Sequence, residues 1–111
     1  MDLLDKIKQN QQEFLFEEVL SFFDEHYHFI PTAFKNGDLY NEANQNNGSC
    51  KIFSFAKMNQ LTQGETLALF GDYYRKDVLG NIDGDDHQNI RNFMKYGWEC
   101  VYFDDNALKS K

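Results

Sequence analysis

Hydrophobic and polar positions follow helical spacing most clearly between Leu61 and Gly80. One face of this stretch is mainly hydrophobic, and it consists of Leu67, Leu69, Phe70, Gly71, Tyr73, Tyr74 and Val78. The opposite face consists of Ala68, Asp72, Arg75 and Lys76. Asp72 and Lys76 have the i, i+4 spacing of an ion pair. Thr62 and Glu65 match a capping box, in which each side chain bonds the backbone amide of the other residue. The pattern therefore predicts one long amphipathic helix at the centre of the fold.

Gly71 lies on the hydrophobic face in the middle of this predicted helix. A glycine inside a helix costs about 1 kcal/mol relative to alanine. Its presence predicts that another element packs closely against the backbone at this point.

Weaker helical patterns occur on both sides of the central stretch. Asp2 is the predicted N-cap of a short first helix with Leu3, Leu4 and Ile7 on one side. Further helices are predicted from about Phe14 to Glu25, from Ser49 to Gln60, and from Asp85 to Gly97. Asp85 is the expected N-cap of the last helix, and Gly97 its expected left-handed C-terminal residue.

Extended structure is predicted in two places. Tyr27–Phe34 is rich in rings and β-branched residues, but Pro31 keeps it out of the middle of a sheet. The Asn36-Gly37 turn signal predicts a small hairpin over Ile30–Tyr40. Trp98–Phe103 is predicted to form a short strand that pairs with the extended segment near Ile30. Residues 1–12 and 104–111 are expected to be frayed ends.

These elements predict an α+β fold: a mainly helical single domain over residues 1–111, with a small antiparallel element made of a hairpin and a C-terminal strand. Aromatic residues make up 16% of the sequence, so rings are expected to fill much of the core. The net charge of −7 and the pI near 4.8 count against binding to nucleic acid or to an anionic membrane. No apolar run approaches the roughly 20 residues that a membrane-spanning helix needs.

Cys50 supports one hypothesis about chemistry, a small cysteine-dependent hydrolase or acyltransferase. It follows Gly48-Ser49 at the start of a predicted helix, where free amides and the helix dipole lower the pKa of a thiol. Lys51 is adjacent and favours the thiolate further. The alternative is that Cys50 is a small buried side chain. The sequence leaves open whether Cys50 and Cys100 are free thiols or form a disulfide.

His87 is the candidate general base of such an enzyme. It opens another predicted helix beside Asp85 and Asp86, and either carboxylate is a candidate to orient the imidazole. The alternative is that His87 packs near Ile90 and Met94 and is satisfied by a carboxylate.

Asn44–Lys51 supports a second hypothesis, a binding site for a small anion. Loop amides that lead into a helix N-terminus suit a phosphate or carboxylate. The candidate ligand-binding residues in this segment are Asn44, Asn47, Ser49 and Lys51. The segment lacks the GK[ST] ending of a phosphate-binding P-loop. The alternative is a loop that turns without binding a ligand.

Tyr73, Arg75 and Arg91 support a third hypothesis, a surface that binds a protein partner. Tyr and Arg are enriched at interface hot spots, and the two arginines are candidates to converge on a carboxylate of the partner. The alternative is that the neighbouring Tyr74 belongs to the core and that Arg75 pairs with Asp72.

The residues predict no metal site and no other cofactor. His26 and His28 form an HxH pair without further ligands of suitable spacing. Asn81–Asp86 resembles a calcium loop, but an EF-hand register places Leu79 and Ile90 where acidic ligands are required.

Several longer strings occur in this chain in a specific order. They are PTAFKNG (Pro31–Gly37), NGSCKIFSFA (Asn47–Ala56), TLALFGDYYRKDVL (Thr66–Leu79), DHQNIRNFM (Asp86–Met94) and GW (Gly97–Trp98). Together they resemble the HopJ type III effector family over about Phe16–Phe103. The chain differs from the family pattern at Ile82, where a proline is expected, and at Cys100, where a glycine is expected.

The resemblance implies delivery by bacterial type III secretion rather than a particular reaction. The N-terminal segment has no apolar region of the kind that a secretory signal peptide contains. The expected location is therefore the cytoplasm of the producing cell, followed by export into a host cell. The first hypothesis is a domain that binds a host or bacterial protein or a small anion, and the alternative is the enzyme based on Cys50 and His87.

Overall fold

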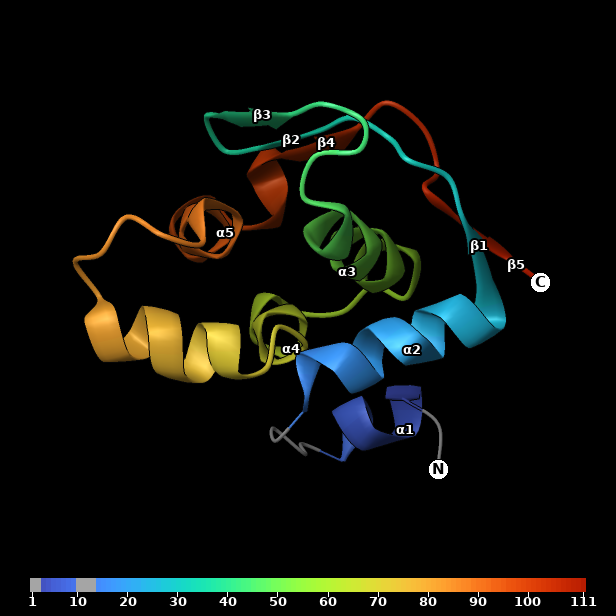
Figure 1. The fold of residues 1–111 in the computed structure, drawn as a ribbon, viewed down its shortest axis with the longest axis horizontal. Helices are drawn as coiled ribbons and strands as arrows, with labels where there is room; N and C mark the ends of the chain where they lie inside the picture. The colour runs from blue at the N-terminus through green and yellow to red at the C-terminus, as the bar shows by residue number, and fades with distance from the viewer. Residues whose placement is uncertain (1–2, 10–13) are drawn as a thin grey trace.

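Helix α3 (Asn47–Met58) lies at the centre of the computed structural model, which describes residues 3–9 and 14–111 (Figure 1). Every residue from Ile52 to Ala56 is buried, because helices or strands pack against several sides of α3. The ring of Phe53 contacts four other aromatic rings, those of Phe34, Phe70, Phe93 and Trp98. Phe rings are therefore the bulkiest side chains of the core, although Leu, Ile and Val are more numerous among the buried residues, so the expectation that rings prevail is met only in size.

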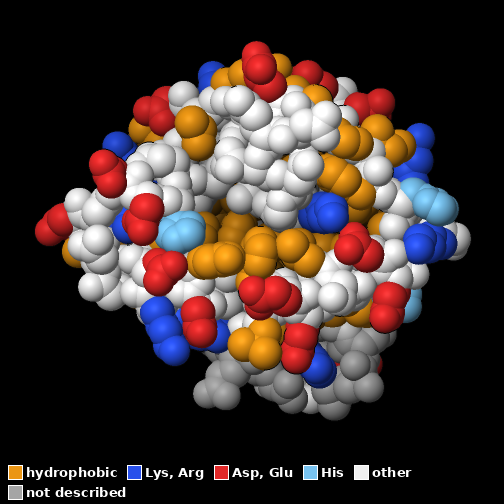
Figure 2. Space-filling view, viewed as in Figure 1, with side chains coloured by type: hydrophobic (Ala, Val, Ile, Leu, Met, Phe, Trp, Pro, Cys, Tyr) orange, Lys and Arg blue, Asp and Glu red, His pale blue; other side chains and the backbone are white. Residues whose placement is uncertain are grey.

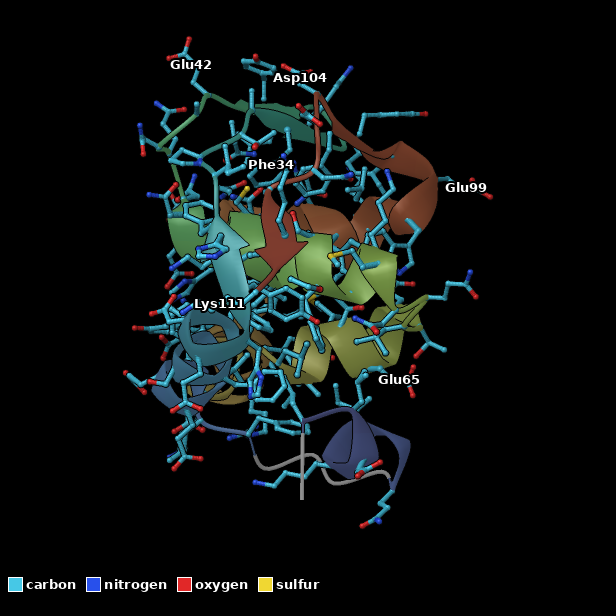
Figure 3. The ribbon with its side chains drawn as sticks, turned by 90° about the vertical axis from the view of Figure 1, so that its right-hand side faces the viewer. Phe34, Glu42, Glu65, Glu99, Asp104 and Lys111 are labelled. Carbon is cyan, nitrogen blue, oxygen red and sulfur yellow. The ribbon has the colours of Figure 1, made fainter. Side chains whose placement is uncertain are left out.

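A three-stranded antiparallel sheet lies over α3 and α5 (Gln88–Tyr96) (Figure 1). Strand β2 (Phe34–Asn36) is in the middle, between β3 (Leu39–Asn41) and β4 (Val101–Phe103). Phe34 is fully buried, and Figure 3 shows its side chain between the sheet and the helices. The hairpin predicted around Asn36-Gly37 is confirmed. The predicted partner of the C-terminal strand is wrong, because β4 pairs with β2 and not with the segment near Ile30.

The C-terminal residues form a second small sheet instead of a frayed end. Strand β5 (Leu108–Ser110) pairs antiparallel with β1 (Tyr27–Phe29), and the amide of Ile30 donates to the carbonyl of Ala107. The side chains of Ala107 and Leu108 are almost fully buried. A three-residue strand is too short to show an alternating pattern, so only its partner reveals it.

The long helix predicted over Leu61–Gly80 is interrupted. It consists of α4 (Gln63–Ala68), a π-helical segment η1 (Tyr73–Val78) and a 3-10 turn η2 (Leu79–Asn81). Gly71 causes the break, with a positive φ of 64°. A Cβ atom there would lie 2.8 Å from the carbonyl oxygen of Phe14, so the predicted close approach of another element is confirmed.

This break changes which side chains face the core. Ala68 is buried although the helical pattern places it outside, and Tyr73 is 38% exposed although the pattern places it inside. The local predictions hold on either side of the break. The capping box of Thr62 and Glu65 is present, and the ammonium of Lys76 lies 3.6 Å from the carboxylate of Asp72.

The N-terminal helices α1 (Leu3–Lys8) and α2 (Phe16–His26) lie below α3 in the view of Figure 1. Leu3 and Ile7 are buried, so residues 3–8 are not a frayed end. The predicted cap Asp2 and residues 10–12 of the predicted frayed end lie outside the described residues.

Helix α5 begins later than the sequence predicts. Its N-cap is His87, in the left-handed conformation, and not Asp85. Its predicted end is confirmed, because Gly97 follows the last turn with a φ of 68°. Trp98–Cys100 form a 3-10 turn, η3, and not the start of a strand. Within residues 3–9 and 14–111, no helix has both the length and the hydrophobicity to cross a bilayer.

Candidate functional site

A pocket of about 510 Å³ lies between the N-terminal ends of α3 and α5. Segments far apart in the sequence line it: Phe16, Leu39, Asn46, Gly48, Ser49, Phe70, Tyr73, His87, Gln88, Asn89 and Ile90. On the face drawn in Figure 2, hydrophobic side chains reach the surface in a central hollow, with a histidine at its left edge. The two helix entries that the sequence singles out, Gly48-Ser49 and His87-Gln88, therefore lie on the same side of the molecule.

The N-terminal end of α3 has no side-chain cap. Asn46 is the N-cap residue and has a left-handed backbone with a φ of 53°. Its side chain makes no hydrogen bond to the helix. Its amide group instead donates to Oδ1 of Asn41 at 2.7 Å. The first helical hydrogen bond runs from the amide of Cys50 to the carbonyl of Asn46. The backbone amides of residues 47–49 consequently have no partner within the described part of the chain.

The N-terminal end of α5 has no side-chain cap either. His87 occupies the N-cap position with a φ of 50°, and its imidazole does not bond the helix. The first helical bond runs from the amide of Arg91 to the carbonyl of His87. The amides of residues 88–90 are therefore also unpaired among the residues that the structure describes.

A network of asparagines joins the two helix ends to the hairpin; Asn36, Asn41 and Asn89 are buried, and Asn46 is exposed. Asn41 and Asn89 bond each other reciprocally through their side chains, at 3.0 and 2.9 Å. Asn36 donates to the carbonyl of Asn89 at 2.7 Å, and Asn46 is attached through Asn41. Buried amide groups carry a large penalty if they lose their partners, so the network fixes the relative position of α3 and α5.

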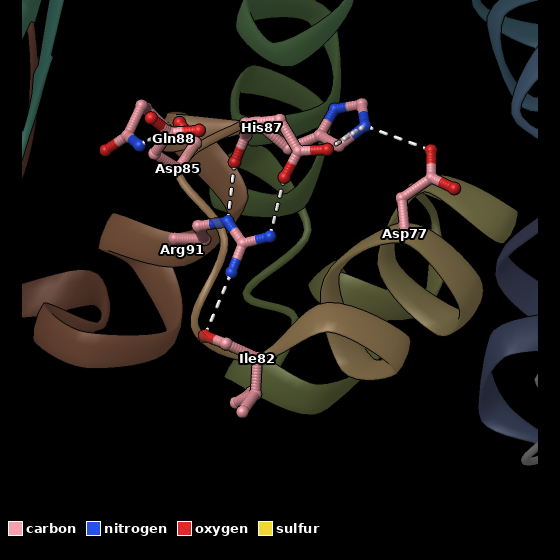
Figure 4. A network of polar contacts seen from close by, with 7 residues as sticks. Asp77, Ile82, Asp85, His87, Gln88 and Arg91 are labelled. Carbon is pink, nitrogen blue, oxygen red and sulfur yellow. Dashed lines mark hydrogen bonds and ion pairs between the residues drawn. The ribbon is translucent and has the colours of Figure 1, made fainter.

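His87 is held at the wall of the pocket by a carboxylate that no local sequence pattern indicates. Its Nε2 lies 3.0 Å from Oδ2 of Asp77 and 3.9 Å from Oδ2 of Asp86 (Figure 4). The ring of Tyr73 packs against the imidazole with ring centres 5.0 Å apart. Because Asp77 accepts a hydrogen bond from Nε2–H, the neutral imidazole has its free lone pair on Nδ1.

Asp86 is engaged with Arg91 on the outside of the pocket. The guanidinium donates to its carboxylate at 2.6 Å and also to the carbonyl of Ile82 (Figure 4). The bond from Arg91 holds the pKa of Asp86 below its ordinary value of 3.8. Asp85 is exposed, and its carbonyl accepts a bond from the side chain of Gln88. Asp77 therefore makes the shortest carboxylate contact with Nε2 of His87, and Asp86 lies farther from the same nitrogen.

Comparison with known families decides the relationship of the chain. The model of the family "HopJ type III effector protein" matches residues 1–108. The chain belongs to the HopJ type III effector family. The resemblance stated from the sequence motifs is thereby confirmed.

The fold of this HopJ-family chain is similar to a known crystal structure, that of VPA0580, described as a protein of unknown function. The two share 46% sequence identity with a TM-score of 0.95, and the alignment covers 100% of this chain and 95% of VPA0580. No curated protein matches the sequence. Family membership supports secretion through a type III system. It indicates no molecular activity, so evidence about activity has to come from the chemistry of the pocket.

Cys50 does not line the pocket of this HopJ-family chain. Its side chain is 1% exposed, and its Sγ donates to the carbonyl of Thr32 at 3.5 Å. Burial raises the pKa of the Cys50 thiol, which is the opposite of the lowering predicted from its place near a helix start. Cys50 and Cys100 are free thiols. These facts favour the alternative stated from the sequence, that Cys50 is a small core residue.

Only some of the predicted ligand-binding residues line the pocket. Ser49 and Tyr73 line the pocket, whereas Asn44 and Asn47 do not. The ammonium of Lys51 lies 3.2 Å from the carboxylate of Asp24, away from the pocket.

The two arginines do not converge. Arg75 donates to the carboxylate of Asp72 and to the carbonyl of Phe14, while Arg91 bonds Asp86. Within the described residues, no cluster of three or more His, Cys, Asp or Glu side chains is placed to hold a metal ion.

Proposed function

We propose that this domain binds a small amphipathic anion, a carboxylate or phosphate with an apolar body, in the pocket between α3 and α5. The observation that supports this most directly is the meeting of two uncapped helix N-termini at one pocket. Each N-terminus of a helix of ordinary length carries a partial charge of about +0.5 and offers backbone donors to an anion. The hydroxyl of Ser49 adds a further donor to the same wall.

The rest of the lining suits an apolar ligand body. Phe16, Leu39, Phe70 and Ile90 form this part of the wall, and the volume lies within the usual range of small-molecule sites. The ring of Phe16 comes so near the backbone that a Cβ at Gly48 would lie 2.7 Å from it. A ligand with its anionic end at the helix amides would therefore reach an aromatic wall within a short distance.

The net charge of −7 opposes the approach of an anion from long range. Close to the pocket, however, two carboxylates already have hydrogen-bond partners. Asp86 is bonded to Arg91, and Asp77 is bonded to His87. Salt screens the long-range repulsion within about 10 Å at 0.1 M, so the local donors dominate the affinity.

Amide chemical shifts test the proposal directly. We expect benzoate to shift the backbone resonances of Gly48, Ser49, Asn89 and Ile90 in a saturable way. Benzyl alcohol has a similar body without the charge, and acetate has the charge without the body, so each should bind more weakly. Equal effects of benzoate and benzyl alcohol would contradict the role of the helix amides.

A matched pair of variants at Ser49 sharpens the test. Ser49→Asp places a carboxylate in the first turn of α3, where it stabilises the helix and occupies the anion position itself. Ser49→Asn has a similar size without the charge. We expect benzoate binding to be lost in the first variant and kept in the second, with thermal stability unchanged or raised in Ser49→Asp. Retained binding in Ser49→Asp would refute the proposed position of the anion.

Of the two ligand classes expected from the sequence, the small anion has more support than a protein partner. The predicted partner surface required Arg75 and Arg91 to point at one carboxylate, and both bond other groups of this chain.

We also propose that the protein resides in the cytoplasm of the producing cell until a type III system exports it into a host cell. This rests on family membership. A translocation reporter fused to the chain, with and without the first fifteen residues, should give a signal only when these residues are present.

A further inference from the structure

His87 has a feature that binding an anion does not require. Asp77 accepts its Nε2–H at 3.0 Å, which leaves the lone pair of Nδ1 as the free basic site of the ring. Nδ1 has no hydrogen-bond partner in the described part of the chain, and in Figure 4 the dashed contact with Asp77 leaves from the other ring nitrogen. The ring is fixed on a third side by Tyr73. A carboxylate-oriented imidazole with a free nitrogen at a pocket wall is the usual arrangement of a general base.

We propose that His87 is the general base of a hydrolase that cleaves small carboxylic esters in the pocket between α3 and α5, with Asp77 as its positioning residue. This inference rests on the proposed function, because the anion that the helix amides bind would be both the oxyanion of the reaction and the carboxylate product. It replaces Cys50 with water as the nucleophile, since the Cys50 thiol is buried outside the pocket. It also replaces Asp85 and Asp86 with Asp77 as the orienting carboxylate.

The reaction needs only water and the ester. A water molecule in the pocket, hydrogen-bonded by the Ser49 hydroxyl, gives a proton to Nδ1 of His87 while its oxygen attacks the ester carbonyl carbon. The carbonyl electrons move to the oxygen, and the unpaired amides at the starts of α3 and α5 stabilise the resulting oxyanion. The carbonyl then re-forms, the bond to the alkoxy oxygen breaks, and the imidazolium returns its proton to the leaving alkoxide. The products are a carboxylic acid and an alcohol, and His87 is neutral again.

Hydrolysis of p-nitrophenyl butyrate by the full chain tests the inference, with His87→Asn as the principal variant. Asparagine tolerates the left-handed backbone at this position, and it is not a base. General-base catalysis contributes about 10²–10⁴-fold, so we expect kcat to fall at least about 100-fold. His28→Asn is the matched control, since His28 is exposed on β1, and it should leave the rate unchanged.

Asp77 is tested by a split between kcat and KM. Asp77→Asn no longer fixes the tautomer, so kcat should fall about tenfold or more while KM and the thermal midpoint stay the same. Asp77→Glu restores the carboxylate and should recover part of the rate. A loss of stability without a selective loss of kcat would make Asp77 merely structural and overturn its role.

The two proposals fail in different ways. Benzoate binding without hydrolysis above the rate of the buffer would overturn the general base and leave the proposed function intact. Hydrolysis that His28→Asn lowers as much as His87→Asn would also overturn it, because exposed imidazoles would then account for the rate. An acylated Ser49 found by mass spectrometry would overturn water as the nucleophile. Hydrolysis that depends on His87 without binding of benzoate would overturn the proposed anion site.

Discussion

Side chains cap the N-terminal end of α4, which we call a closed end. The N-terminal ends of α3 and α5 have no side-chain cap, and we call them open ends. In α4 the hydroxyl of Thr62 accepts from the amide of Glu65 at 3.1 Å, and the carboxylate of Glu65 accepts from the amide of Thr62 at 2.8 Å. At α3 the side chain of Asn46 bonds Asn41 instead of the helix. At α5 the carboxylate of Asp86 bonds Arg91.

This difference does not follow from the types of residue present. Asparagine and aspartate are among the best N-cap residues, and each typically contributes about 1 kcal/mol to helix stability. At α3 the fold directs the side chain of Asn46 to Asn41. At α5 the N-cap position is held by His87, whose imidazole bonds Asp77, and Asp86 just before it bonds Arg91. Both helix ends left open face the same pocket. The difference lies in the surroundings: the start of α2 also lacks a side-chain cap, but the uncapped starts of α3 and α5 both face one pocket, and this supports the proposed anion site.

Among the changes considered, disruption of the buried asparagine network should reduce the stability of the fold most. Asn89→Ala leaves the side-chain amide of Asn41 buried without its partner, so we expect a loss of about 1–3 kcal/mol. Chemical denaturation measures this, with Asn106→Ala as the control because Asn106 is exposed and bonds through its backbone amide. A loss equal to that of the control would show that the network does not hold the two open ends together.

Removal of the cap at the closed end of α4 should reduce the stability of the fold by less than disruption of the asparagine network. Thr62→Ala removes the side-chain acceptor of the capping box and should cost about 1 kcal/mol. Amide shifts caused by benzoate at Gly48 and Asn89 should not change, since α4 does not line the pocket. A change of benzoate affinity in this variant would remove the distinction between open and closed ends.

An acidic residue at the open end of α3 should have a smaller and stabilising effect. The first turn of α3 has no acidic residue, whereas that of α4 already contains Glu65. Asn47→Asp should therefore stabilise the fold by about 0.3–1 kcal/mol, and high salt should reduce the gain. Thermal unfolding at low and high salt measures this, with Asn47→Gln as the uncharged control. A gain that salt does not affect would point to a cause other than the helix dipole.

The pair of Asp86 and Arg91 should have the smallest effect, and it should depend on pH. The folded-state pKa of Asp86 is lowered, so its contribution is present above its ordinary pKa of 3.8 and is lost as the pH falls through the folded-state value. Asp86→Asn should be slightly less stable than the original chain at pH 7 and equally stable in strong acid. Unfolding curves across this range test the sign, with Asp83→Asn as the exposed control in the same loop. A difference that persists in strong acid would exclude the ion pair as its cause.

Local patterns in the sequence predicted much of the fold. The capping box of Thr62 and Glu65, the Asn36-Gly37 turn and the end of α5 at Gly97 each depend on residues a few positions apart, and all are confirmed. The interruption at Gly71 escaped prediction because the hydrophobic pattern continues through it. A glycine that permits close packing and a glycine that interrupts a helix have the same sequence context, and Gly71 does both: its φ is 64°, and the backbone of Phe14 packs against it.

The candidate site was only partly accessible from the sequence. Ser49, Tyr73 and His87 were singled out and line the pocket, but Cys50 is directed into the core from the same turn of α3. Asp77 and Asn89 gave no local signal, because their partners lie ten and forty-eight residues away along the chain.

By itself, the sequence determined the family and the α+β class and placed the starts of α3 and α5 close to where they lie, because each depends on residue type and on spacing within one or two turns. The tertiary structure decided which side chains cap those entries, which carboxylate holds His87, and that both open ends face one pocket. The physical reason is that a polar side chain bonds whichever partner the packed chain brings within about 3 Å of it. Packing of segments far apart in the chain sets that distance, and the local pattern does not.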